Sequence, residues 1–130
     1  METLLMKILF LLYTAILTFL LVTSRPHDFV QPIEGWTALL ETWAHLIAFT
    51  LLAFLAALAR TRKPLWLIVV ALIAYAAATE IIQGFTATRT PEWKDLIQDV
   101  IGVALGTSLG WGASSFLRRI RSGTDDSSPR

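Results

Sequence analysis

The stretch "TEIIQGFTATRTPEWKDLIQDVIGVALG", residues 79–106, places charged side chains between two segments that are otherwise almost wholly apolar. The chain around it is 55% hydrophobic and has a mean hydropathy of +0.60. Soluble domains are about 45–50% apolar even when glycine is counted. A domain of 130 residues has too small an interior to bury so many aliphatic side chains. The composition therefore predicts an integral membrane protein.

Four segments reach the roughly 17–20 apolar residues that a membrane-spanning helix needs. None of them alternates with a period of two, so helices are favoured over strands. The expected spans are Leu4–Val22, Trp43–Ala59, Leu65–Ile82 and Leu96–Leu117. The sequence thus predicts an all-α fold, an integral membrane bundle of four transmembrane helices over residues 1–121, followed by a disordered tail at 122–130.

The first segment also has features of a secretory signal peptide, since Lys7 precedes an apolar run that ends in "LVTSRP", residues 21–26. The run is long for such a peptide, and no Ala-x-Ala cleavage site follows it. We therefore expect this segment to be the first helix of the bundle.

Lysine and arginine residues near the ends of the spans predict the orientation of the bundle, because they favour the cytoplasmic side. Arg60, Arg62 and Lys63 join the second and third spans, and further arginines follow the fourth. The connection over residues 23–42 instead has one arginine and three acids. We expect a multi-pass protein of the cell membrane with both termini in the cytoplasm. His45 and the polar residues of 79–106 then lie at a similar depth, near the outer leaflet.

The composition also restricts the classes of ligand and partner that the protein can bind. A formal net charge of +1 argues against a nucleic-acid binder, which would carry a clustered basic face. The absence of cysteine excludes disulfides, thiolate metal sites and cysteine nucleophiles. Carboxylates four residues apart on a helix are a weak signal for a divalent cation, so we expect neither a metal nor a cofactor. The expected partners are membrane lipids, and a homo-oligomer is compatible with the sequence.

Glu80 and Gln83 lie three residues apart, so they share a helix face about one turn from the outer end of the third span. An ionisable residue at such a depth is costly and usually functional. The alternative is that Glu80 simply extends to the lipid headgroups.

Asp95 and Asp99 lie four residues apart at the start of the fourth span. Asp95 can help to stabilise the positive end of the helix dipole. Asp99 lies deeper, and two ionised carboxylates at this spacing repel each other unless a cation lies between them or one is protonated. Arg89 is the nearest arginine, and its planar fork suits either these carboxylates or a phosphate group of a ligand.

His45 stands at the outer end of the second span. By itself it suits a hydrogen-bonding role at the membrane interface, but beside Glu80 or an aspartate it would suit acid/base chemistry. Gly102, Gly106 and Gly110 continue the helix face of the two aspartates. Small residues of this kind let membrane helices approach closely, so we expect the aspartates to point into the bundle.

Several positions, taken in order over about residues 45–106, resemble the VanZ-like family. They are His45, Glu80, Gln83, Phe85, Arg89, Asp95, Asp99, Gly102 and Gly106. Two departures are Asp99, where the family usually has asparagine, and Ala87, where it often has proline. The first puts in doubt any role that needs a neutral amide at this position, unless the aspartate is protonated.

The resemblance implies a small bacterial membrane protein whose site faces the cell envelope. The family is named for a protein associated with low-level resistance to the glycopeptide antibiotic teicoplanin, and the resemblance implies no particular reaction.

The leading hypothesis is binding of a polar or phosphate-bearing group of a lipid-linked cell-envelope component at the outer leaflet, with an effect on glycopeptide susceptibility. The ligand-binding residues would be Gln83, Arg89, Asp95 and Asp99. A second hypothesis is a membrane-embedded acid/base enzyme that uses His45 and Glu80. A third is a proton or solute transporter, although the predicted cytoplasmic halves of the spans hold few polar residues that would continue a path.

Overall fold

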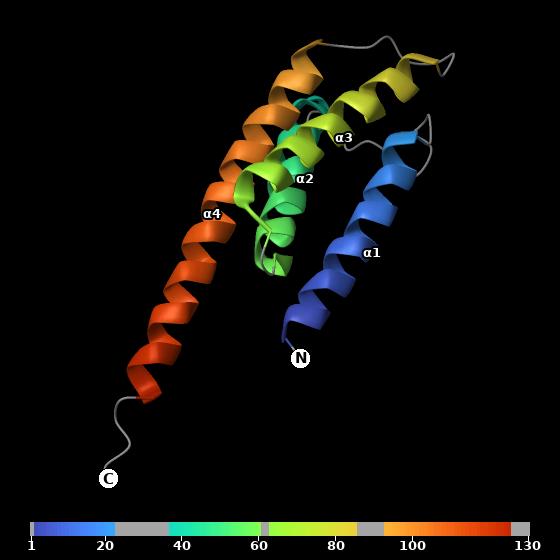
Figure 1. Cartoon of the computed structure of the whole chain (residues 1–130). Helices are drawn as coiled ribbons and strands as arrows, with labels where there is room; N and C mark the ends of the chain where they lie inside the picture. Colours follow the sequence, from blue (N-terminus) through green and yellow to red (C-terminus); the bar gives the residue numbers. More distant parts are fainter. Residues whose placement is uncertain (1, 23–36, 61–62, 86–92, 126–130) are drawn as a thin grey trace.

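The computed structural model describes residues 2–22, 37–60, 63–85 and 93–125, which form four helices (Figure 1). They are α1 (Glu2–Val22), α2 (Thr37–Ala59), α3 (Leu65–Phe85) and α4 (Trp93–Asp125). Each contains one of the predicted apolar segments. The all-α prediction is therefore confirmed.

The fourth helix continues further than the sequence predicts. α4 ends at Asp125, so residues 122–125 are helical and do not belong to a disordered tail. An existing helix gains one hydrogen bond for each residue it adds, which lets it extend through a polar stretch that would not start a helix alone. Residues 126–130 lie outside the described part of the chain.

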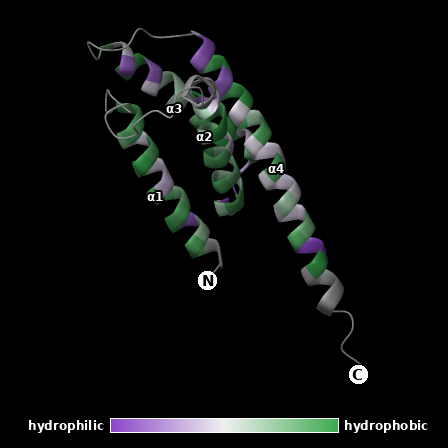
Figure 2. Cartoon of the chain, turned by 180° about the vertical axis from the view of Figure 1, so that it is seen from behind, coloured by the Kyte–Doolittle hydropathy of each residue, from purple (hydrophilic) through white to green (hydrophobic). Residues whose placement is uncertain are grey.

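α2 forms the centre of the bundle and contacts each of the other three helices, α4 most extensively. Its Phe49, Leu52 and Ala53 side chains are fully buried. Figures 1 and 2 show α1 and α4 on opposite sides of α2. The core therefore lies along α2, and the helices around it turn their other faces outward.

The outward faces are apolar, as contact with lipid requires. On α1 alone, Leu4, Leu11 and Phe19 are each more than 60% exposed. Among the described residues, three apolar stretches are long enough to cross a membrane: Leu4–Val22, Leu65–Phe85 and Trp93–Ile120. The apolar part of α2, Trp43–Ala59, is shorter. Four crossings with both termini in the cytoplasm therefore stay a prediction.

Glycines on α4 bring it into backbone contact with α2. A methyl group placed on Gly102 would lie 2.7 Å from the carbonyl oxygen of Leu46. One placed on Gly106 would collide with the carbonyl oxygen of Thr50, and one on Gly110 would lie 2.6 Å from Cβ of Ala57. Numbers increase together on both helices, so α2 and α4 run parallel. This α2–α4 seam fixes their register.

Candidate functional site

One turn before Gly102, the α2–α4 seam contains a cluster of one histidine and two aspartates. Nδ1 of His45 lies 3.0 Å from Oδ1 of Asp99, and Nε2 lies 3.8 Å from Oδ2 of Asp95. His45 is 6% exposed and Asp99 only 1%, whereas the Asp95 side chain is 23% exposed. The cluster therefore consists of a buried pair, His45 and Asp99, and a partly accessible carboxylate, Asp95.

Local sequence explains how these side chains meet. His45 lies one turn before the fully buried Phe49 on α2, so both share the face that packs into the core. Asp95 and Asp99 are one turn apart on α4, and Gly102 permits the close approach of the backbones just below them. A side chain at Gly102 would move α4 away from the backbone of α2 and lengthen the contact between His45 and Asp99.

The pairing sets the roles of the two imidazole nitrogens. With Asp99 ionised, its carboxylate accepts and Nδ1 of His45 donates. Nε2 then faces Asp95 at a distance that allows an ion pair but exceeds a direct hydrogen bond. Asp99 thus orients the His45 ring so that Nε2 points toward Asp95, the more accessible residue of the cluster.

The second oxygen of Asp99 is also buried. Oδ2 has no hydrogen-bond partner among the described residues, and the same is true of Oε1 of the neighbouring Gln98. A buried acceptor without a donor costs about 1–3 kcal/mol. A hydrogen-bond donor from a ligand would relieve this cost, so the cluster has unused capacity to accept hydrogen bonds.

The structure places the other predicted site residues differently. Gln83 is buried on α3, and its Nε2 donates to the carbonyl oxygen of Leu21 at 3.0 Å, which joins α3 to the end of α1. Glu80 lies one turn earlier on α3 and is partly buried. Arg89 lies outside the described residues. Figure 2 shows hydrophilic residues gathering at this end of the bundle, where α3 ends and α4 begins.

Within the described residues, no group of three or more histidine or acidic side chains is arranged to hold a metal ion. The His45, Asp95 and Asp99 side chains can take part in hydrogen bonding, charge pairing and proton transfer.

Two polar contacts of α1 were not predicted from the sequence. The Tyr13 hydroxyl donates to the carbonyl oxygen of Ala48 at 3.1 Å, and the hydroxyls of Thr18 and Tyr75 lie 2.8 Å apart. Hydroxyls within apolar helices often bond across helix interfaces. The sequence could therefore have indicated that these hydroxyls form hydrogen bonds between helices, but not which residues they contact.

Comparison with known proteins identifies a family to which the sequence is similar. Residues 5–116 match the sequence model of the VanZ/LLP1 family, and this range includes the whole His45–Asp95–Asp99 cluster. No curated protein and no solved structure matches the chain.

Proposed function

The chain belongs to the VanZ/LLP1 family, and we propose that it binds the polar part of a lipid-linked cell-envelope component near the outer leaflet. In this proposal the protein is a multi-pass protein of the bacterial cell membrane with four spans and both termini in the cytoplasm. The observation that carries the proposal is the buried His45–Asp99 pair beside the more exposed Asp95.

The geometry favours a ligand group that donates hydrogen bonds. Asp99 uses Oδ1 for His45, and its Oδ2 has no partner in the described part of the chain. Asp95 adds a second, partly exposed carboxylate. Hydroxyl or ammonium groups would pair well with these oxygens, whereas a phosphate placed between the two carboxylates would be repelled.

A phosphate-bearing ligand therefore needs a cation beside the cluster. Arg89 fills this role in the proposal, because guanidinium groups bind phosphate through two parallel hydrogen bonds. Gln83 contributes by holding the end of α1 beside α3 through the carbonyl oxygen of Leu21. A protein that captures such an envelope component would also alter susceptibility to glycopeptide antibiotics.

Binding to purified protein in nanodiscs tests this assignment, with a panel of polyprenyl phosphates and pyrophosphates as probes. Arg89→Ala and Asp95→Asn should each weaken binding about tenfold, which corresponds to about 1.4 kcal/mol. Arg118→Ala is the matched control, because Arg118 is an exposed arginine at the other end of α4. Unchanged affinity in both site variants, or an equal loss in the control, would refute the assignment.

A second candidate function is acid/base catalysis on the same class of lipid. It is favoured by the orientation of His45, whose ring is held through Nδ1 by Asp99 while Nε2 faces the accessible Asp95. A positioned imidazole of this kind can transfer protons. The binding experiment separates the two functions if product formation is followed as well. Turnover that disappears in the double variant His45→Ala with Glu80→Gln would establish catalysis, and binding without turnover would favour a binding protein.

A further inference from the structure

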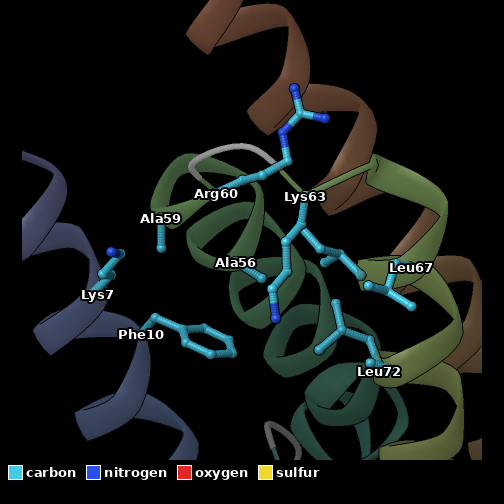
Figure 3. A pocket seen from close by; sticks show the side chains of 10 residues that line it. Lys7, Phe10, Ala56, Ala59, Arg60, Lys63, Leu67 and Leu72 are labelled. Atoms are coloured by element: carbon cyan, nitrogen blue, oxygen red, sulfur yellow. The ribbon is translucent and has the colours of Figure 1, made fainter.

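The end of the bundle opposite the His45–Asp95–Asp99 cluster holds a cavity of about 470 Å³ between α1, α2 and α3. Its walls are mainly apolar and include Phe10 of α1, Ala56 of α2 and Leu72 of α3 (Figure 3). The volume falls within the roughly 300–1,000 Å³ of typical small-molecule sites. We call this space the basic cavity, for the charges described next.

Three cationic side chains surround the basic cavity: Lys7 from α1, Arg60 from the end of α2 and Lys63 just before α3. None of the described residues that line it is acidic. In Figure 3 the Lys63 ammonium extends between Phe10 and Leu72, Lys7 faces the cavity from α1, and the Arg60 guanidinium turns toward α4. Lys7 of α1 and Lys63, just before α3, therefore both line the cavity and offer an anion two cations from separate parts of the chain.

We propose that the basic cavity binds an anionic phospholipid of the surrounding membrane. The phosphodiester group would lie between Lys7 and Lys63, and an acyl chain would run along the apolar walls. Charge complementarity supports this occupant, because lysine is a common phosphate partner and basic pockets between membrane helices bind anionic headgroups. The combination of cations and apolar walls matches both parts of a phospholipid.

The same placement suggests what the lipid does. α1 is the least buried of the three long apolar helices, with 6% of its span buried against 28% for α4. A phosphate held by Lys7 and Lys63 would connect α1 to the start of α3, at the end of the bundle remote from the contact between Leu21 and Gln83. The bound lipid would thus fasten α1 to the rest of the protein.

The test compares phosphatidylglycerol with phosphatidylcholine, first by lipid retention in native mass spectrometry and then by thermal unfolding in mixed micelles. Phosphatidylglycerol should be retained preferentially and should raise the Tm. The double variant Lys7→Gln with Lys63→Gln should lose at least tenfold in phosphatidylglycerol affinity, and the Tm increase should disappear. Arg60→Gln should have a smaller effect, because its guanidinium faces away from Phe10.

Two control variants test whether the effect on lipid binding is specific to the two lysines of the basic cavity. The double variant Lys7→Arg with Lys63→Arg retains both charges and should retain the lipid, and its helical circular dichroism checks folding. The variant Arg118→Gln with Arg119→Gln removes the same charge from the exposed end of α4 and should leave lipid binding unchanged. Full lipid preference in the glutamine variant, or equal loss in the α4 control, would overturn the proposal. So would inorganic phosphate that stabilises the protein as well as phosphatidylglycerol does.

Discussion

The two ends of the bundle differ in how their charged side chains are compensated. In the α2–α4 seam, His45 and Asp99 are buried and paired with each other at 3.0 Å. At the other end, Lys7 and Lys63 are exposed and surround a cavity without an acidic partner among its described lining residues. A charge inside a low-dielectric seam is costly unless another side chain compensates it, whereas a charge beside an open cavity can take its counter-charge from a lipid.

The difference follows from how closely the helices approach. From Gly102 to Gly110, glycines bring the α4 backbone against α2, so a ligand of the cluster would reach it from the outer end, where Asp95 is partly exposed. α1 packs mainly on α2 and less on α3, and the basic cavity lies between these three helices. Close packing thus favours the buried pair of His45 and Asp99, and looser packing leaves a cavity between α1, α2 and α3.

The largest expected effect comes from breaking the close contact itself. Gly106→Ala would place a methyl group in collision with the Thr50 carbonyl oxygen and 2.8 Å from Cβ of Ala53. Such overpacking typically costs about 1–3 kcal/mol, and the backbone contact puts this variant at the upper end. Unfolding in mixed detergent micelles measures the loss of stability.

Gly112→Ala is the matched control for this variant, because a methyl group on Gly112 would have no neighbour within 4 Å. It should be neutral or stabilising by up to about 1 kcal/mol, since alanine favours helix more than glycine does. If both variants have the same stability, the close approach of α2 and α4 is not needed for the fold.

A smaller effect is expected from altering the buried pair. Asp99→Asn keeps an oxygen that can accept from His45 Nδ1, so it should change the unfolding free energy by less than about 1 kcal/mol. Asp99→Leu leaves the buried imidazole without this partner and should cost about 1–3 kcal/mol. Chemical denaturation measures both, and histidine nitrogen chemical shifts report whether the ring keeps its hydrogen bond. A leucine variant as stable as the asparagine variant would show that the pair does not stabilise the seam.

The sequence predicted more of the seam than of the basic cavity. Hydropathy located the helices, and the shared face of Asp99 with the glycines led us to expect that the aspartates point into the bundle. Asp99 does so and contacts His45 there, whereas Asp95 is partly exposed. The partner of Gln83 was not predictable, because it is the backbone carbonyl of Leu21, and a carbonyl has no signature in the sequence. In the sequence, Lys63 indicated only the orientation of the bundle. The basic cavity that it lines could not be predicted, because a cavity depends on how the helices pack and produces no periodic sequence pattern.

The smallest expected effect concerns the polar contacts that hold α1. Tyr75→Phe and Thr18→Val each remove one side of the hydroxyl pair at 2.8 Å. A double-mutant cycle of unfolding free energies should give a coupling of about 0.6 kcal/mol, the average for hydrogen bonds between membrane helices. Thr14→Val is the control, because its hydroxyl donates to the carbonyl of Phe10 within α1 itself. It should show no coupling to Tyr75→Phe.

The size of this coupling also indicates how much a lipid in the basic cavity adds to the attachment of α1. If it stays near 0.6 kcal/mol, side-chain hydrogen bonds hold α1 only weakly, and a lipid between Lys7 and Lys63 would add substantially to its attachment. A coupling several times larger would mean that α1 is already held firmly by its own side chains. The lipid would then contribute a smaller share of the attachment of α1, while its effect on the Tm would still follow its affinity for the folded protein.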